Sequence, residues 1–222
     1  MKSKDKALVI FSGGADSTIC LHWAIKKFGA VEAITFDYGQ RHKIEIDAAV
    51  KICELNNIPQ KIVEINSFAQ LGDNALTNES IKIDASNKGQ LPNTFVPGRN
   101  LIFLTMAAAW AHNRNISELV TGVCQTDFSG YPDCRDETIQ ALQKSISLGM
   151  DCAFQIHTPL MFITKAESIQ MANELDGFDS LALSHTCYEG KSPPCGQCPS
   201  CVLRQKGFDE AGFTDPIYSQ IN

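Results

Sequence analysis

Short apolar runs alternate with amphipathic helical segments along this chain, and this alternation restricts it to few folds. Runs rich in β-branched residues predict strands at 7–11, 31–36, 61–65, 119–123 and 181–184. Apolar residues at helical spacing predict helices at 18–28, 42–55, 100–112, 136–148 and 199–211. Strands that alternate with helices form a parallel sheet covered on both sides. The expected fold is therefore α/β, a Rossmann-like parallel five-stranded sheet with helices on both faces.

Length and local composition divide the chain into two parts. A chain of 222 residues fits one α/β domain with a small appendage. Residues 1–185 hold the alternating pattern and are expected to form that domain. The cysteine-rich residues 186–222 are expected to form a small C-terminal lobe. Residues 66–98 fit neither period, and a connection of this length is usually functional or mobile.

Three polar loops follow predicted strands, at 12–17, 37–42 and 122–135. In a parallel sheet, right-handed crossovers place the loops after the strands at one edge, where ligands bind. We therefore expect the three loops to meet at one crevice.

The loop after the first strand reads SGGADS and leads into a predicted helix. It has neither the spacing of a Walker A loop nor that of the dinucleotide fingerprint. Gly13 and Gly14 allow the backbone to approach a ligand closely, and the amides at the start of the helix favour anions. With the hydroxyls of Ser12, Ser17 and Thr18, the turn is expected to hold pyrophosphate without a lysine.

Asp16 places a carboxylate in this anion site. A carboxylate does not favourably face phosphate alone, but it can hold Mg²⁺, and the metal then bridges the phosphates. The alternative is a polar turn in which Asp16 caps the helix. Because the whole SGGxDS pattern stands between a strand and a helix, we favour the phosphate site.

The loop GVCQTDFSGYPDCR offers groups that a flat, purine-like ring needs. A carboxylate, Asp127 or Asp133, could accept two hydrogen bonds from the N–H groups of a guanine-like edge. Phe128 or Tyr131 could stack on the ring, and Arg135 adds a cation. The alternative is a Gly-Tyr-Pro turn decorated with polar side chains.

Four further cationic or ionisable side chains are expected near the crevice: Arg41, His42, Arg99 and Lys165. One or more could neutralise charge on a nucleotide or on a substrate carboxylate. A Thr164–Glu167 capping box places Lys165 in the first turn of a helix, where a cation is mildly unfavourable. That placement favours a role for Lys165. Ordinary solvated charge is the alternative for each of them.

Four of the nine cysteines cluster near the C-terminus, at Cys187, Cys195, Cys198 and Cys201. Four thiolates at such spacings suit a tetrahedral Zn²⁺, and a site without an open position is structural. An iron–sulfur cluster is the competing interpretation, because it also takes four cysteines. The other five cysteines are expected in packing roles, which we rank above a catalytic thiol at Cys124 or Cys134.

The formal net charge is −6, from 19 basic and 25 acidic residues. This weighs against a tRNA or DNA partner, because affinity for the phosphate backbone comes from clustered Lys and Arg. The apolar part of MKSKDKALVIF is too short for a signal peptide or a membrane span. We expect a cytoplasmic protein that binds neither nucleic acid nor membrane.

SGGADS resembles the PP-loop of the ATP pyrophosphatase superfamily, whose fold is called adenine nucleotide alpha-hydrolase-like. Five further stretches resemble the 7-cyano-7-deazaguanine synthase family of queuosine biosynthesis: DYGQRH, VPGRN, GVCQTDFSGYPDCR, TPLMFITKAE, and TCYEG with its cysteines. The resemblance runs nearly end to end and is weakest at 66–90.

The resemblance implies an ATP-dependent ligase that forms a homodimer and holds one structural zinc per chain. It implies catalytic roles for Asp16, Lys165 and Arg99. Binding of ATP and its pyrophosphate would fall to Phe11, Ser12, Gly13, Gly14, Ala15, Asp16, Ser17, Thr18, Ile19, Cys20 and Leu21. The substrate would contact Arg41, Asp127, Phe128, Tyr131, Asp133 and Arg135.

The implied reaction turns the acid 7-carboxy-7-deazaguanine into the nitrile 7-cyano-7-deazaguanine (preQ0). ATP, split between its α- and β-phosphates, adenylates the carboxylate, and ammonia displaces AMP to give an amide. A second ATP activates the amide oxygen, and loss of AMP leaves the nitrile. One rival is a tRNA-modifying enzyme, which should show a basic face. Others are a glutamine-dependent synthetase, which should carry a glutaminase domain, and a zinc-stabilised nucleotide-binding module without catalysis.

Overall fold

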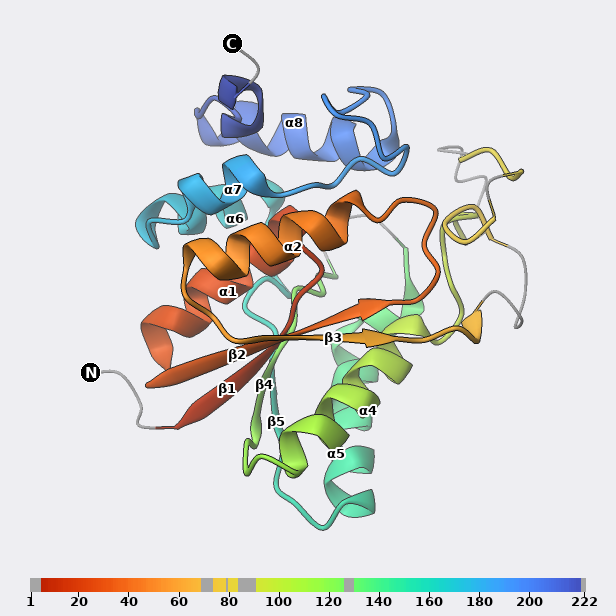
Figure 1. Ribbon diagram of the computed structural model, residues 1–222, viewed down its shortest axis with the longest axis vertical. Coiled ribbons are helices and arrows are strands. Elements are labelled where there is room, and N and C mark those ends of the chain that lie inside the picture. The colour runs from red at the N-terminus through yellow and green to blue at the C-terminus, as the bar shows by residue number, and fades with distance from the viewer. Residues whose placement is uncertain (1–4, 69–73, 79, 84–90, 126–129, 221–222) are drawn as a thin grey trace.

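A five-stranded sheet forms the centre of the protein (Figure 1). The computed structural model describes residues 5–68, 74–78, 80–83, 91–125 and 130–220. The strands are β1 (Lys6–Ile10), β2 (Ala30–Asp37), β3 (Gln60–Glu64), β4 (Glu118–Val120) and β5 (Gln155–His157). They run in the order β3-β2-β1-β4-β5, and every neighbouring pair is parallel. The predicted α/β fold is confirmed.

The fifth strand is not where the sequence pattern placed it. Residues 181–183 belong to the short helix α7 (Phe178–Leu183), which begins after Gly177, so the strand predicted at 181–184 is wrong. The fifth strand is β5, and it pairs with β4 from Glu118↔Gln155 to Val120↔His157. A run of three apolar residues does not distinguish a strand from a buried helical turn, and a three-residue edge strand leaves almost no periodic signal.

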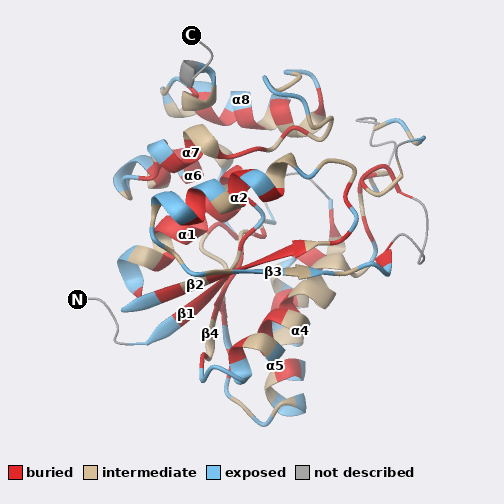
Figure 2. Ribbon diagram, viewed as in Figure 1, coloured by how far each residue is buried: buried red, intermediate tan, exposed pale blue. Residues whose placement is uncertain are grey.

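Helices cover both faces of the sheet, as predicted. On one face lie α1 (Ala15–Lys27), α2 (Ile44–Leu55), α6 (Lys165–Glu174), α7 and α8 (Pro199–Ala211). On the other lie α4 (Arg99–His112) and α5 (Asp136–Gly149). Side chains alternate between the two faces along β1. Ala7 and Val9 pack in the hydrophobic core on the α1 side of the sheet, and Leu8 packs in the core on the α4 side. The central strands are accordingly among the most buried parts of the chain (Figure 2).

The C-terminal segment is tied to the sheet domain by α8, which packs on α6. Arg204 of α8 is buried and forms a two-point ion pair with Asp215, with N–O distances of 2.6 and 2.8 Å. The same guanidinium donates to the Ser184 hydroxyl at 2.8 Å. Gly212 ends α8 in the left-handed region, as its predicted cap role requires. Two short 3₁₀ turns, Pro132–Cys134 and Pro216–Gln220, complete the described elements.

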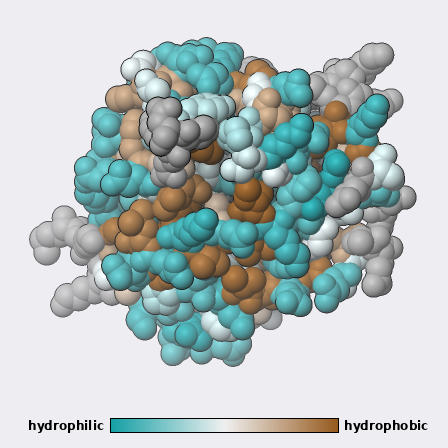
Figure 3. All heavy atoms as spheres, turned by 45° about the horizontal axis from the view of Figure 1, so that its top comes forward, coloured by the Kyte–Doolittle hydropathy of each residue, from teal (hydrophilic) through white to brown (hydrophobic). Residues whose placement is uncertain are grey.

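Hydrophilic side chains cover much of the face seen when α8 and the C-terminus turn toward the viewer, with groups of apolar side chains between them (Figure 3). Within the described ranges, every helix is too short or too polar to cross a membrane.

Candidate active site

The three loops that were predicted to meet do meet, at the carboxyl ends of the strands. They border a cavity of about 650 Å³, which is lined by Ser17 after β1, Gln40 after β2 and Tyr131 after β4, among others. The strand order reverses between β1 and β4, and open parallel sheets bind ligands at this switch point. The volume is in the range of small-molecule sites.

The SGGADS turn joins β1 to α1 and faces the cavity. Gly13 has φ +83°, and a Cβ there would lie 2.2 Å from the carbonyl oxygen of Glu45, so only glycine fits. The hydroxyl of Ser17 donates to the Gly14 carbonyl at 3.0 Å and lies 3.1 Å from the Ser12 hydroxyl. The N-cap Gly14 has no side-chain cap, so the alternative in which Asp16 caps the helix is not observed. The first amides of α1 are thus left available for an anion.

Asp16 and Lys165 both line the cavity and form an ion pair. The Lys165 ammonium donates to Asp16 Oδ1 at 2.6 Å, and the lysine side chain is largely buried. The predicted capping box is present, since the Thr164 hydroxyl accepts from the Glu167 amide at 3.2 Å and the Glu167 carboxylate accepts from the Thr164 amide at 2.7 Å. This cap fixes the start of α6. The pair with Asp16 explains why a lysine stands in the first turn of a helix.

A glycine of α8 makes room for Lys165. A Cβ at Gly207 would lie 2.2 Å from Lys165 Cγ, and Gly207 itself is buried. The close approach of α8 to α6 therefore depends on this glycine, and α8 holds the lysine stem against the phosphate turn.

Another wall of the cavity is aromatic and carries a half-buried arginine, Arg99. Arg99 donates to the Tyr38 hydroxyl at 3.2 Å, and its guanidinium lies 5.5 Å from the centre of that ring. The hydroxyls of Tyr131 and Thr94 lie 2.6 Å apart. Burial raises the pKa of Tyr38 to about 12, so its hydroxyl stays protonated at neutral pH. The wall combines flat apolar surface with hydrogen-bonding groups and a positive charge, which suits an anionic heterocycle.

Several residues predicted for the site do not line the cavity. The side chains of Phe11, Ile19, Cys20 and Leu21 lie in the hydrophobic core beneath the turn. Thr18 is also fully buried, and its hydroxyl donates back to the Gly14 carbonyl at 2.9 Å. These five residues can therefore support the turn, whereas ligand contacts fall to Ser12, Gly14, Ala15, Asp16 and Ser17, which line the cavity.

Of the residues in loop 122–135 that were predicted to contact a ring, some line the cavity and others do not. Tyr131 lines the cavity. Asp133 is buried and accepts a hydrogen bond from the Asn100 amide at 3.1 Å, which fixes the start of α4. Arg135 is exposed at the start of α5 and is not among the residues that line the cavity. Asp127 and Phe128 lie outside the described residues.

Two of the predicted candidates near the crevice have visible structural partners. The Arg41 guanidinium lines the cavity but donates to the carbonyls of Ala75 and Ile81, at 3.1 and 3.3 Å. It therefore anchors the long insertion after β3.

His42 packs against Gly190, where a Cβ would lie 2.1 Å from the imidazole. Burial raises the pKa of the Cys134 thiol to about 12, which supports a packing role for that cysteine.

The sequence pattern missed several cavity residues. Tyr38, Gln40, Thr94 and Tyr188 line the cavity, and so does Glu45 in the first turn of α2. The available signal for Glu45 was its position just after the DYGQRH loop, because the first turn of the next helix faces the same crevice.

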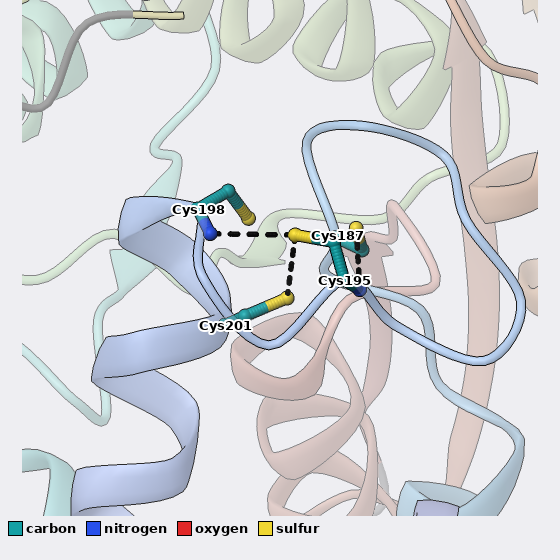
Figure 4. Close-up of side chains that lie close together, drawn as sticks. All are labelled: Cys187, Cys195, Cys198 and Cys201. Atoms are coloured by element: carbon teal, nitrogen blue, oxygen red, sulfur yellow. Dashed lines mark hydrogen bonds between the residues drawn. The ribbon is translucent and has the colours of Figure 1, made fainter.

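The four clustered cysteines converge as predicted (Figure 4). Cys187 and Cys195 come from the loop before α8, Cys198 caps that helix and Cys201 lies in its first turn. Their sulfur atoms all lie within 4.8 Å of one another, and those of Cys195 and Cys201 are 3.9 Å apart. A tetrahedral ion with metal–sulfur bonds of about 2.3 Å needs sulfur atoms about 3.8 Å apart. The cluster therefore fits one metal ion, and it is the one such group found in the described ranges.

Backbone amides also point at these sulfur atoms. The amide of Cys195 donates to Cys187 Sγ at 3.4 Å, and the amide of Cys198 donates to Cys195 Sγ at 3.3 Å. Such bonds stabilise thiolate over thiol and orient the ligands. Cys187 and the start of α8 also line the cavity, so an ion held here would shape the rim of the site.

Comparison with known proteins points to the same family that the sequence motifs resemble. A 7-cyano-7-deazaguanine synthase from Chromobacterium violaceum is 55% identical over 97% of this chain and 94% of its own length. Another, from Laribacter hongkongensis, is 52% identical over 100% of this chain and 97% of its own. The U34-tRNA thiolase NcsA from Methanococcus maripaludis, solved with its 4Fe-4S cluster, matches 98% of this chain and 70% of its own, with a TM-score of 0.51. At 21% identity that likeness shows the fold alone.

The family model of the queuosine biosynthesis protein QueC matches residues 6–212, from the first strand to the end of α8. The match includes the phosphate turn, the Asp16–Lys165 pair and all four clustered cysteines. The chain therefore belongs to the QueC family, and the family resemblance predicted from its motifs is confirmed.

Proposed function

We propose that this protein is an ATP-dependent ligase, a 7-cyano-7-deazaguanine synthase of queuosine biosynthesis. It converts 7-carboxy-7-deazaguanine and ammonia to 7-cyano-7-deazaguanine and releases AMP and pyrophosphate. The observation that carries this proposal is near full-length identity above 50% to proteins of that name. The cavity supports it, because a phosphate turn and an aromatic wall with an arginine face the same space.

In the proposed mechanism the turn holds the pyrophosphate that leaves. The amides at the start of α1 and the hydroxyls of Ser12 and Ser17 contact its oxygens. Lys165 neutralises charge that develops on the phosphates, and Asp16 keeps the lysine in place. Asp16 is also placed to hold Mg²⁺, which needs only one or two carboxylates when phosphates supply the remaining ligands. When bound, Mg²⁺ would stabilise the negative charge of the leaving pyrophosphate.

The deazaguanine ring is proposed to lie against the aromatic wall. Arg99 faces the substrate carboxylate and draws it toward the α-phosphate of ATP. Tyr131 contacts the ring, and Asp127 and Phe128 remain predicted partners of its edge and face. Asp133 and Arg135 contribute less directly, since one holds the start of α4 and the other is exposed.

The remaining parts of the proposal concern the metal, the assembly and the surroundings. Zn²⁺ is the proposed occupant of the cysteine cluster, in a structural role, because four thiolates leave no open position for a substrate. Ammonia is the proposed nitrogen donor, and the proposed assembly is a homodimer. A cytoplasmic location fits nine cysteines of which none is paired in a disulfide. An acidic chain fits the absence of a nucleic-acid partner.

Analysis of the nucleotide products tests the proposed cleavage site. With Mg²⁺–ATP, ammonium and the deazaguanine acid, we expect AMP and pyrophosphate, and their release should depend on the acid. Chromatography of the nucleotides separates AMP from ADP. Release of ADP and phosphate would contradict a turn that grips pyrophosphate.

Replacing Gly207 with Ala should slow the reaction without direct contact to any substrate. The new methyl group would displace the Lys165 stem and shift its ammonium away from Asp16. A displacement of about 1 Å can cost roughly 100-fold in rate. We expect kcat to fall by roughly 10- to 100-fold in steady-state assays. Gly149→Ala is the matched control, since a Cβ at that helical glycine meets nothing within 4 Å. Equal activity of the two variants would argue against α8 as the support of Lys165.

A further inference from the structure

Glu45 is an unusual carboxylate in this cavity. Two carboxylates line the cavity within the described ranges, Asp16 and Glu45. Asp16 is held by Lys165 at 2.6 Å. Glu45 has no such ion pair in the part of the chain that the structure describes. The positive charge of Arg99 lowers the pKa of Glu45, but the Arg99 guanidinium donates its hydrogen bond to the Tyr38 hydroxyl.

Glu45 lies between the two halves of the site. Its carbonyl oxygen stands against Gly13, so the first turn of α2 touches the phosphate turn. Glu45 also lines the cavity, and the charge of Arg99 in the aromatic wall acts on its carboxylate. The group is therefore placed near the point where the leaving phosphate and the substrate carboxylate must meet.

A neutral neighbour, Gln40, acts on Glu45. The Gln40 oxygen accepts from the Tyr38 amide at 2.9 Å. Gln40 lowers the pKa of the Glu45 carboxyl as a hydrogen-bonding neighbour, against the effect of burial. Because Gln40 is neutral, it suppresses the proton affinity of Glu45 less than an ion pair would.

Burial raises the pKa of Glu45 to about 7, against the opposing effects of Arg99 and the Gln40 hydrogen bond. Asp37, at the end of β2, acts in the same direction as burial. Titratable or charged groups on the other elements and loops that line the cavity are Asp16, Tyr38, Arg41, His42, Arg99, Cys124, Tyr131, Cys134, Lys165, His185, Cys187, Tyr188, Arg204 and Lys206. A carboxylate with this pKa can both accept and release a proton near neutral pH.

Both steps of the proposed reaction remove protons from nitrogen. In the first, the nitrogen of ammonia forms a bond to the acyl carbon, the C–O bond to AMP breaks, and one proton leaves the nitrogen. In the second, AMP departs from the O-adenylated amide with the C–O electron pair. The protons of the nitrogen are lost, and its electrons complete the carbon–nitrogen triple bond. Because both steps act on one carbon, one base can serve both.

We propose that Glu45 is the general base that accepts the proton from nitrogen in both steps. The proposal rests on the proposed function. Other cavity groups are less suited. Asp16 is committed to Lys165, and burial keeps Tyr38 protonated. His185 faces the Cys187 carbonyl at 3.3 Å, and His42 packs on Gly190 beside the cysteine cluster. Glu45 releases each proton to solvent before it accepts the next one within the same turnover, so the balance needs no further reactant.

Glu45→Gln separates activation from nitrogen transfer. Adenylation of the acid needs no base at nitrogen, so exchange of pyrophosphate into ATP, dependent on the acid, should continue unchanged in the variant. Formation of amide and nitrile from ammonium should fall by roughly 100-fold or more. Hydroxylamine is a weaker base than ammonia and is largely unprotonated at neutral pH. It should therefore still trap the acyl adenylate as the hydroxamate. Glu54→Gln, on the exposed side of the same helix, is the control and should leave all three rates unchanged.

The wild-type protein supplies a test that does not depend on the folding of a variant. At saturating ammonium, kcat should rise as the pH passes about 7, because the deprotonated carboxylate is the active form. If kcat of the wild-type protein does not rise as the pH passes about 7, the proposal is overturned. Loss of exchange in a folded Glu45→Gln protein, or full turnover of ammonium by it, would also overturn it. If the wild-type protein shows no exchange that depends on the acid, the proposed function itself fails.

Discussion

Asp16→Asn should lower turnover by about 100- to 1,000-fold while the protein still folds. Asn has the shape of Asp but lacks the charge that holds the Lys165 ammonium at 2.6 Å and that would bind Mg²⁺ at the phosphate turn. Both losses fall on the step in which negative charge builds up on the pyrophosphate. Steady-state rates at saturating ATP and acid measure the effect, and circular dichroism with a thermal melt checks the fold.

Asp176→Asn is the matched control for this charge removal. Asp176 also pairs with a lysine, Lys26 at 3.0 Å, but the pair is exposed on the surface. An exposed pair contributes about 0–1 kcal/mol, so this variant should keep its activity and almost all its stability. Near-normal turnover of Asp16→Asn would remove Asp16 from the catalytic machinery and leave the pair with Lys165 as a structural contact.

Cys198→Ser should release the metal ion and destabilise the protein. Structural zinc sites contribute about 10–16 kcal/mol of binding energy in isolated peptides, and one missing thiolate forfeits a large part of it. Cys198 is also the N-cap of α8, the helix that supports Lys165 through Gly207. In a chain of this size each 1 kcal/mol lost lowers Tm by about 2–4 °C, so every 3 kcal/mol of metal binding that is lost should lower Tm by roughly 6–12 °C.

Elemental analysis beside the thermal melt identifies the metal in the same samples. The wild-type protein should carry one zinc per chain and little iron, and Cys198→Ser should carry neither. Cys152→Ser, a partly buried cysteine outside the cluster, should retain the zinc. A full complement of zinc in Cys198→Ser would show that the ligand assignment is incorrect. Iron in the wild-type protein would favour the iron–sulfur alternative.

The sequence was most informative where a local pattern determines the structure. The β1–turn–α1 unit, the capping box at Thr164 and the glycine cap at Gly212 each depend on a few adjacent residues, and each lies where it was predicted. The sequence pointed to a role for Lys165 but did not identify Asp16 as its partner. The unfavourable placement of a lysine hinted at a partner, but the partner is 149 positions away in the chain.

Other features depend on tertiary packing and could not be predicted from the sequence. The apolar residues 181–183 lie in a helix, α7, which packs against α1, α2 and the C-terminal 3₁₀ turn, and these contacts are made only in the folded chain. Asp133 points at the start of α4 rather than into the cavity, since the Asn100 amide needs an acceptor. The pKa of Glu45 is raised by burial and by the charge of Asp37, both of which depend on the folded chain. Such environments exist only after the chain has folded.

Mass spectrometry of one reaction tests the central claim most directly. The reaction contains the purified, zinc-loaded protein with Mg²⁺–ATP, ammonium and 7-carboxy-7-deazaguanine. We predict that the nitrile, 7-cyano-7-deazaguanine, accumulates together with AMP and in proportion to it. Failure to convert the acid, or conversion accompanied by ADP in place of AMP, would contradict the assignment of this cavity as a nitrile-forming ligase site.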